Sequence, residues 1–322
     1  MNAAHLLCTA VLATSLVSCV ETAAPVDEDS ENDDGDGKAD IWGTDDRKEL
    51  YAYRGTPLFE ASRTEGGLID TNTLEKKSNG NFAIPNVLSL RASAHLCKNQ
   101  RFATQPASAY CSGTLIAPDL IVTAGHCLRS CSNVSFVFGL GYDSKPASGA
   151  LNNIVNDIPA DNVYTCKEIV ARELTEKIGP SEKEAVDYAV IRLDRAVVGR
   201  TPAKFNISAK LAAGTAVAVI GHPSGLPLKI AEGKVLDATM EFMVPHDADV
   251  FGGNSGCGLF DKQGLLVGMH SRSSSQRYVE ENGCYVVAVC GVNAQCPEVP
   301  KAYDTLDLWT RLPANVKAEL AP

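Results

Sequence analysis

The sequence predicts an all-β fold, either a barrel or a sandwich, with one helix near its C-terminal end. Short runs rich in apolar and β-branched residues alternate with clusters of Gly, Pro, Asn and Asp, a pattern typical of strands joined by turns. The 16 prolines and 26 glycines fit this pattern. We predict strands at residues 112–116, 120–123, 134–138, 186–193, 216–220, 233–238 and 265–269.

The helix is predicted at residues 313–320, because Pro313 is well suited to the first helical turn. Many short strands followed by a late helix favour an all-β barrel or sandwich. The 322 residues, of which 45% are hydrophobic, allow one large all-β unit with a proper core.

The net charge of −10 is concentrated in one segment. Residues 21–40 hold nine acidic residues and one basic residue, and therefore carry −8, which leaves −2 for the rest of the chain. Because the remainder is nearly neutral, nothing in the composition favours nucleic-acid binding.

The N-terminal region predicts export. Residues 6–18 form an apolar run that is too short to span a membrane and suits the core of a signal peptide, assigned to residues 1–19. The residues before Cys19 resemble a lipoprotein cleavage site, so Cys19 is the expected lipidation site; an ordinary signal peptide is the alternative. Residues 20–40 are predicted to be a disordered acidic linker or propeptide, and residues 41–322 the folded domain.

Cysteine usage predicts disulfides and an oxidising compartment. Cys8 and Cys19 lie in the leader, and nine of the eleven cysteines follow it. Nine is an odd number, so one thiol stays outside disulfides or pairs with another molecule. No cysteine pair has metal-site spacing, and no metal or organic cofactor is expected.

Three segments point to chemistry. Residues 111–127 run from Cys111 to the stretch Thr-Ala-Gly-His-Cys; residues 187–193 read Asp-Tyr-Ala-Val-Ile-Arg-Leu; residues 252–256 read Gly-Gly-Asn-Ser-Gly. Taken singly, they are compatible with a core histidine beside a disulfide, an acid at the start of a buried strand, and a turn. Together, in the order His126, Asp187, Ser255, they favour nucleophilic catalysis by a serine.

This set of motifs resembles the trypsin and chymotrypsin superfamily of serine proteases over residues 41–312. The Gly-Asn-Ser-Gly stretch and residues 43–47 are similar to the bacterial glutamyl-endopeptidase branch, and residues 221–227 resemble bacterial members of the superfamily. The resemblance implies two antiparallel six-stranded β-barrels with a C-terminal helix. It also implies a disulfide between Cys111 and Cys127, at the family's spacing.

The resemblance assigns a role to each site residue. Ser255 is the expected nucleophile, His126 the general base and Asp187 the group that orients the histidine. The N–H groups of Gly253 and Ser255 are expected to form the oxyanion hole. Asn254 replaces the aspartate to which a new amino terminus binds in trypsin, so activation by that insertion is not expected.

Substrate specificity stays open at this stage. His270 stands fifteen residues after Ser255, where a histidine in the glutamyl-endopeptidase branch binds an acidic substrate side chain. Asp249 stands six residues before Ser255, where trypsin keeps the aspartate that selects Lys or Arg. Val250 takes the place of a hydroxyl residue of the pocket. His270 therefore predicts acidic P1 residues, and Asp249 predicts basic ones.

Two further departures concern the C-terminal half. Cys257 replaces a small residue and is expected to form a disulfide with the region of Cys284–Cys296 that braces the loop. Residues 269–307 form a longer stretch than usual and are predicted to be an inserted, disulfide-stapled loop near the pocket.

The sequence thus predicts a secreted or cell-surface serine endopeptidase, located in the periplasm, on the outer membrane or outside a bacterial cell. Its expected partner is a protein or peptide substrate, with a membrane tether through Cys19 and a monomeric state. The alternative from another class is an inactive, protease-like binding protein at the cell surface. An esterase is a third reading, since acyl chemistry is shared.

Overall fold

The computed structural model describes residues 41–174, 186–207, 211–237, 243–272, 277–294, 303–306, 309 and 312–320. The predicted signal peptide, the acidic linker and Cys19 lie outside these residues. Within the described residues, no helix combines the length and the apolar character needed to cross a membrane.

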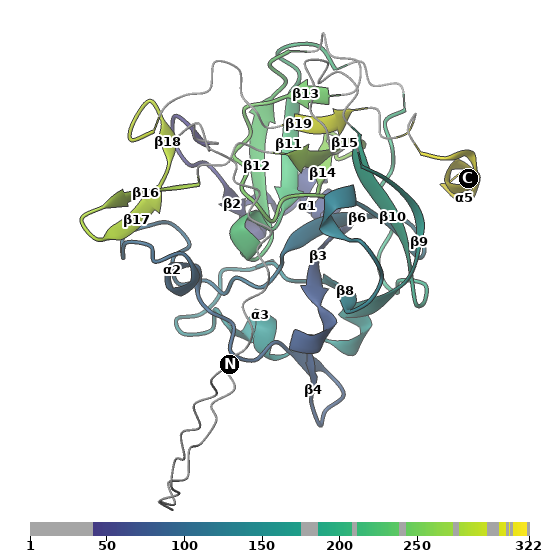
Figure 1. Cartoon of the computed structure of the whole chain (residues 1–322), viewed down its shortest axis with the longest axis horizontal. Helices are drawn as coiled ribbons and strands as arrows, with labels where there is room; N and C mark the ends of the chain where they lie inside the picture. Colours follow the sequence, from purple (N-terminus) through teal and green to yellow (C-terminus); the bar gives the residue numbers. More distant parts are fainter. Residues whose placement is uncertain are drawn as a thin grey trace, which may run out of the picture. The chain divides into compact units, whose positions relative to one another are not determined.

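Six antiparallel strands close into a barrel in the order β10-β7-β6-β3-β8-β9 (Figure 1). Alternate side chains of these strands point inward, as the two-residue period of a strand requires. Ile121, Phe136 and Ile191 are examples that pack together in the barrel core. The strands are β3 (Glu65–Asp70), β6 (Cys111–Ala117), β7 (Leu120–Thr123), β8 (Val134–Phe138), β9 (Val163–Leu174) and β10 (Asp187–Leu193).

A second sheet has the strand order β13-β19-β15-β14-β11-β12-β2. A β-bridge between Val235 and His246 joins the end of β12 to the end of β13, so six of its strands curl back on themselves. This arrangement agrees with the predicted double-barrel fold, with β2 as an additional strand. The strands are β2 (Lys48–Glu49), β11 (Ala216–Gly221), β12 (Lys229–Lys234), β13 (Met243–Pro245), β14 (Gly258–Phe260), β15 (Leu266–Arg272) and β19 (Tyr303–Leu306).

A further hydrophobic core lies between the barrel and the second sheet. It takes the outward faces of strands from both: Leu120 and Val190 from the barrel, and Ile220 and Phe260 from the sheet. The strands at this junction are therefore buried on both faces and read as nearly continuous apolar runs. Val316 of the C-terminal helix α5 (Ala314–Leu320) packs into the same core.

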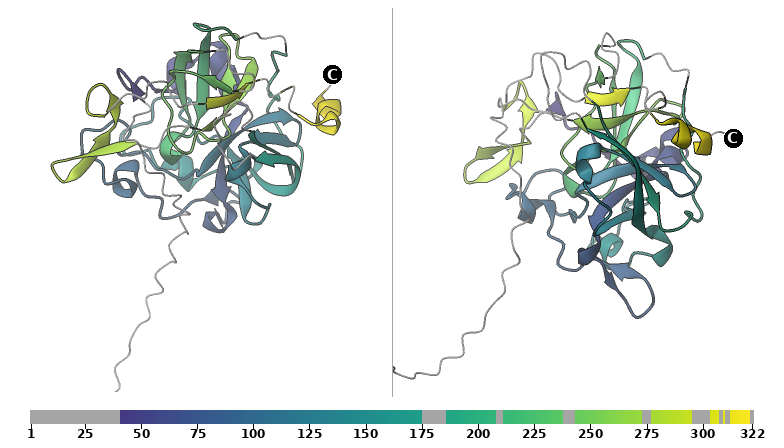
Figure 2. Two further views of the ribbon diagram at one scale, coloured as in Figure 1. Left: turned by 45° about the horizontal axis from the view of Figure 1, so that its top comes forward. Right: turned by 45° about the vertical axis from the view of Figure 1, so that its right-hand side comes forward.

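Short elements surround the two sheets. Strand β1 (Ile41–Trp42) pairs in parallel with β18 (Val289–Cys290), β4 (Glu75–Lys76) forms a hairpin with β5 (Phe82–Ala83), and β16 (Tyr278–Glu281) forms one with β17 (Cys284–Val287). The β16–β17 hairpin projects from the rest of the body in both views of Figure 2, where it is yellow-green. The remaining helices are α1 (Pro57–Ser62), α2 (Leu90–Ser93), α3 (Asn153–Asn156), and the 3₁₀ turns η1 (Leu50–Tyr53), η2 (Thr71–Thr73), η3 (Gly125–Cys127), η4 (Ala160–Asn162) and η6 (Pro223–Gly225).

The strand predictions succeed where a segment is apolar on both faces and bounded by turns. Strands 120–123 and 134–138 match at both ends, and four others match in position with ends that differ by at most three residues. The prediction of 233–238 is wrong, because the strand there is Lys229–Lys234. Strands β3 and β9 were not predicted: β3 contains two adjacent glycines, and most of β9 is only partly buried.

The disulfides confirm one expected pair and correct another. Cys111 bonds to Cys127, as expected, and Cys131 bonds to Cys166. Cys284 bonds to Cys97 rather than to Cys257, because the β16–β17 hairpin extends toward the segment that carries Cys97 (Tyr285 N–H donates to His95 O, 3.0 Å).

The expected disulfide at Cys257 is therefore wrong. Cys257 keeps its thiol and is fully buried in the core of the second sheet. Its Sγ lies so close to Gly221 that a Cβ at that glycine would be 2.9 Å away. Cys290 is disulfide-bonded, and Cys296 lies outside the described residues.

A buried carboxyl group joins the barrel to the second sheet. Glu65 of β3 is 1% exposed and accepts hydrogen bonds from Thr114 Oγ1 (2.6 Å) and from Gly258 N–H of β14 (3.2 Å). Burial raises the pKa of Glu65 well above its usual range, against the lowering effect of these hydrogen bonds. The protonated form is thus favoured in the folded protein relative to the unfolded chain.

This pKa predicts the effect of Glu65→Gln. Because the folded-state pKa is raised, the carboxyl contributes stability below its unfolded pKa and loses that contribution as pH rises through the folded pKa. The free energy of unfolding of Glu65→Gln minus that of the wild type, measured by denaturant titration, should therefore increase as pH rises from about 5 to about 9. Glu65→Ala should cost about 1–3 kcal/mol, since Gly258 N–H then has no acceptor.

The exposed Glu60 provides the control. The free energy of unfolding of Glu60→Gln should have the same pH dependence as that of the wild type. Identical pH profiles for Glu65→Gln and the wild type would show that Glu65 is not protonated on folding.

Candidate active site

His126 and Asp187 form a two-point contact. His126 lies in η3, directly after β7, and Asp187 is the first residue of β10, which pairs with β7. One carboxylate oxygen of Asp187 accepts from the backbone N–H of His126 (3.0 Å), and the other lies 2.7 Å from Nδ1 of its ring. The Asp187 side chain is 2% exposed and that of His126 is 41% exposed. This arrangement favours the tautomer with the proton on Nδ1, which leaves Nε2 as an acceptor.

The turn before His126 admits no side chain. A Cβ at Gly125 would lie 2.8 Å from Glu173 O and 3.1 Å from Asp187 Oδ1. The carbonyl of Gly125 accepts from Arg172 Nε of β9 (2.8 Å). Glycine here lets the backbone of His126 approach the carboxylate.

The loop of Ser255 is tied to the first barrel through its backbone. The carbonyl of Ser255 accepts from Ser112 N–H of β6 (2.9 Å), and Ser112 Oγ donates to the carbonyl of Gly253 (2.7 Å). Cys127 Sγ lies 3.6 Å from the Ser255 carbonyl oxygen. The half-buried Ser255 is therefore fixed beside the residue that follows His126.

Two glycines give this loop its shape. Gly253 and Gly256 have φ of +95° and +88°, which other residues rarely adopt. A Cβ at Gly256 would overlap Thr123 Oγ1 and Ser112 O, and one at Gly253 would overlap His222 O. The loop thus packs backbone to backbone against its neighbours.

The same loop leaves the N–H groups of Gly253 and Ser255 available. Other backbone groups around them are engaged: Ser224 N–H donates to Gly252 O (2.6 Å), Asn254 N–H to Phe251 O (3.0 Å) and Gly256 N–H to His270 O (2.7 Å). Among the described residues, none accepts from the N–H of Gly253 or of Ser255. These are the two groups that the sequence assigned to an oxyanion hole.

Asp249 is occupied by the beginning of the folded domain. Its carboxylate accepts from the backbone N–H groups of Asp46 (2.7 Å) and Trp42 (3.4 Å), and the residue is 3% exposed. Burial raises the pKa of Asp249, which favours its uncharged form. Its environment differs from that of an exposed counter-ion at the base of a pocket.

His270 and Val250 are buried as well. His270 is 1% exposed and its ring lies edge-on to that of His246, with 5.8 Å between centroids. Val250 is fully buried among the apolar side chains inside the second sheet. The structure therefore brings two imidazoles together behind the Ser255 loop and places Val250 in the core.

Sequence reasoning missed Ser112, whose hydroxyl links the loop of Gly253 to the first barrel. It also missed the tight fit of Asn254, which is 2% exposed and whose Oδ1 lies against Gly221. Ser112 follows Cys111 in the motif, so its position was visible, but a serine in an apolar strand gives no sign of its partners.

One group of potential metal-ligand atoms occurs within the described part of the chain, formed by Cys111, His126 and Cys127. The two sulfur atoms form a disulfide with each other and so offer no thiolate. This group does not have the donors of a zinc site.

The chain is similar to one known protein family and to proteins of known structure. A family model described as the trypsin-like peptidase domain matches residues 111–269. The chain is similar to the structure of a Glu endopeptidase in complex with MPD, with 19% identity over 73% of this chain and 88% of that one, at a TM-score of 0.42. It is also similar to the serine endoprotease from Yersinia pestis, with 13% identity over 84% of this chain and 66% of that one, at a TM-score of 0.45. No curated protein sequence matches the chain.

The matched residues include His126, Asp187 and Ser255 and run from β6 to β15. Residues 111–269 therefore belong to the trypsin-like peptidase family, and the chain is a serine endopeptidase of the superfamily that its motifs resemble.

Proposed function

We propose that this endopeptidase cleaves peptide bonds through an acyl-enzyme formed on Ser255, with His126 as general base and Asp187 as the residue that orients it. The observation that carries the proposal is the two-point contact of Asp187 with the backbone and ring of His126. A carboxylate that is buried and bonded in this way holds the imidazole in the tautomer that accepts a proton at Nε2.

In the first step, Ser255 Oγ attacks the carbonyl carbon of the scissile bond and its proton passes to His126 Nε2. The tetrahedral intermediate collapses as the C–N bond breaks and the leaving nitrogen takes the proton back from the imidazolium. Water, deprotonated by the same imidazole, then hydrolyses the acyl-enzyme and restores the Ser255 hydroxyl.

The N–H groups of Gly253 and Ser255 serve as the oxyanion hole in this proposal. Both lie on a loop whose backbone is hydrogen-bonded to Ser112 at Gly253 O and Ser255 O, so they are held in place before substrate binds. Preorganised donors of this kind lower the barrier by about 2.7–4 kcal/mol each.

A covalent probe tests the nucleophile. The folded, disulfide-intact protein should react with a fluorophosphonate at Ser255, as found by peptide mass mapping, and should cleave denatured casein. Ser255→Ala should abolish labelling and lower kcat by about 10⁶. Ser132→Ala, at an exposed serine, is the matched control and should behave like the wild type.

The outcome also separates the alternatives. Folded protein that neither labels nor cleaves would support the inactive binding protein and overturn the proposal. Labelling with ester hydrolysis but without peptide cleavage would indicate an esterase.

The proposal includes a preference for an acidic P1 residue. The support comes from Asp249, the residue that would select Lys or Arg. Its carboxylate already accepts hydrogen bonds from two backbone N–H groups, and its pKa is raised. An uncharged carboxyl gives no ion pair to a basic side chain. His270 is the residue to which the acidic preference is assigned in this proposal, and its backbone carbonyl is bonded to the Ser255 loop at Gly256 N–H (2.7 Å).

A peptide library with all residues at P1 tests this preference. We expect cleavage after Glu or Asp to exceed cleavage after Lys or Arg by at least about tenfold in kcat/KM, the order of one charge-assisted hydrogen bond. A preference for Lys or Arg would contradict this assignment and would indicate that Asp249 determines the specificity.

We further propose that the protein is exported and tethered through a lipid on Cys19, a residue outside the described part of the chain. The disulfides support an oxidising compartment. Mass analysis of the mature amino terminus should find a diacylglyceryl-modified Cys19 at position one, and Cys19→Ala should release the protein into the soluble fraction. An unmodified amino terminus at any other residue would argue against the tether.

A further inference from the structure

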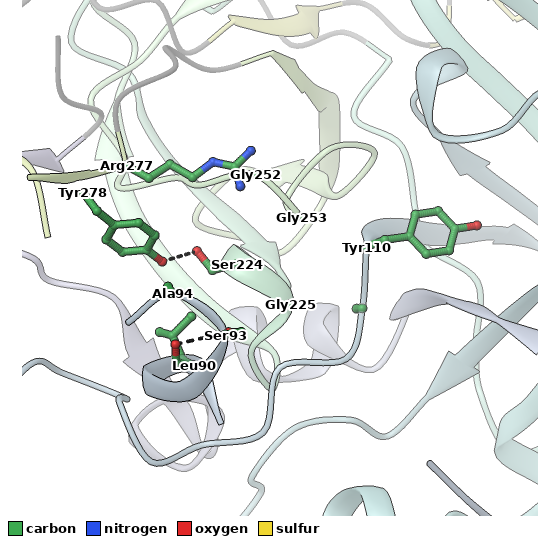
Figure 3. Close-up of a pocket in the computed structure, with 11 residues that line it drawn as sticks. Leu90, Ser93, Ala94, Tyr110, Ser224, Gly225, Gly252, Gly253, Arg277 and Tyr278 are labelled. Carbon is green, nitrogen blue, oxygen red and sulfur yellow. Dashed lines mark hydrogen bonds between the residues drawn. The ribbon is translucent and has the colours of Figure 1, made fainter. Parts of the chain in front are cut away.

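A cavity of about 310 Å³ opens beside the loop of Ser255. Gly252 and Gly253 form part of its lining (Figure 3). Tyr110 lies on the opposite side of the cavity from Arg277 and Tyr278. The cavity therefore shares Gly253 with the proposed oxyanion hole.

The position of His126 tells which part of a substrate would enter this cavity. The leaving nitrogen takes its proton from His126, so the product that leaves first extends toward that residue. Cys127 follows His126 and is bonded to Cys111, which follows Tyr110. A cavity bordered by Gly253 and Tyr110 thus lies on the leaving-group side, whereas His270 contacts the loop at Gly256.

Among the described residues that line the cavity, Arg277 is the only one with a charged side chain. Its guanidinium lies against the backbone of Gly252, where a Cβ would overlap it. Arg277 is exposed, and within the described residues no carboxylate forms an ion pair with it. The cavity therefore presents an uncompensated positive charge next to the reacting loop.

The wall that carries Arg277 is anchored at several points. Tyr278 OH is hydrogen-bonded to Ser224 Oγ (2.9 Å), and the Tyr278 ring stacks on Phe251, the residue before Gly252. The carbonyl of Arg277 accepts from Ala288 N–H (3.0 Å), and Cys97–Cys284 ties the β16–β17 hairpin to the segment after α2. These contacts fix the backbone of Arg277, so a ligand that binds its side chain does not have to order the backbone there as well.

We propose that this cavity binds the substrate on the leaving-group side of the scissile bond, and that Arg277 makes it prefer Asp or Glu at one of the first three residues there. The proposal rests on the proposed peptidase function and adds a second determinant of specificity. A guanidinium is suited to a carboxylate because it offers parallel N–H donors to both oxygens.

Position-scanned peptides test the assignment. Fluorescence-quenched peptides share one cleavable P1 residue, taken from the library above, and carry Glu, Ala or Lys at the first, second or third residue after the scissile bond. At one position we expect kcat/KM for Glu to exceed that for Lys about tenfold. About 1 M NaCl should reduce this ratio, since salt screens an exposed ion pair.

Substitutions then assign the preference to Arg277. Arg277→Gln should bring the Glu-to-Lys ratio to within about twofold of unity and Arg277→Glu should invert it. Arg54→Gln, at an exposed arginine outside the cavity, should keep the wild-type ratio. A merely structural effect of Arg277 would slow all peptides by the same factor and leave the ratio unchanged, which would overturn the proposal.

The two proposals fail in different ways. If the wild-type protein cleaves all the peptides at similar rates, the result contradicts the proposed role of Arg277 but not the peptidase function. A folded wild-type protein that cleaves none of them, and fails to label at Ser255, contradicts the peptidase function and this inference with it.

Discussion

The hydrogen bonds of Ser112 hold the second sheet to the first barrel at the site, and the geometry of the site depends on them. Ser112 contacts two segments far away in sequence: the loop of Ser255, through Ser255 O and Gly253 O, and the N–H of His222. Its carbonyl accepts from Thr123 Oγ1, at the end of the strand that leads to His126. One residue thus relates the loop of the proposed nucleophile to the strand that positions the histidine.

Buried charge at the start of the folded domain has a comparable role. Lys229 is 2% exposed, pairs with Glu49 (3.1 Å) and donates to Gln105 (2.9 Å), which in turn donates to Glu49 (2.6 Å). Burial lowers the pKa of Lys229 to about 8. Such a pair adds little net stability, whereas removal of one partner leaves an uncompensated buried charge at a cost of about 3–5 kcal/mol. It aligns β2 with β12, and the chain before β2 reaches Asp249.

Much of the first barrel could be predicted from the sequence, because its strands are short apolar runs between turns. Strand β7 and the Cys111–Cys127 disulfide are local features, sixteen residues apart at most. Strand β9 was not predicted because most of its residues are exposed or half-exposed and show no clear alternation. Cys257 was assigned a disulfide because a buried thiol and a bonded one look alike in a sequence.

The sequence by itself determined the all-β class, the order of His126, Asp187 and Ser255, and the glycines around the serine, because each is a matter of residue type and local spacing. Only the tertiary structure decided that Cys97 bonds to Cys284, that Asp249 binds the backbone of residues 42 and 46, and that Arg277 lies over Gly252. The first two join segments about 190 to 210 residues apart, and the third depends on how the β16–β17 hairpin packs. Contacts of this kind are set by the packing of whole sheets, so local sequence patterns do not predict them.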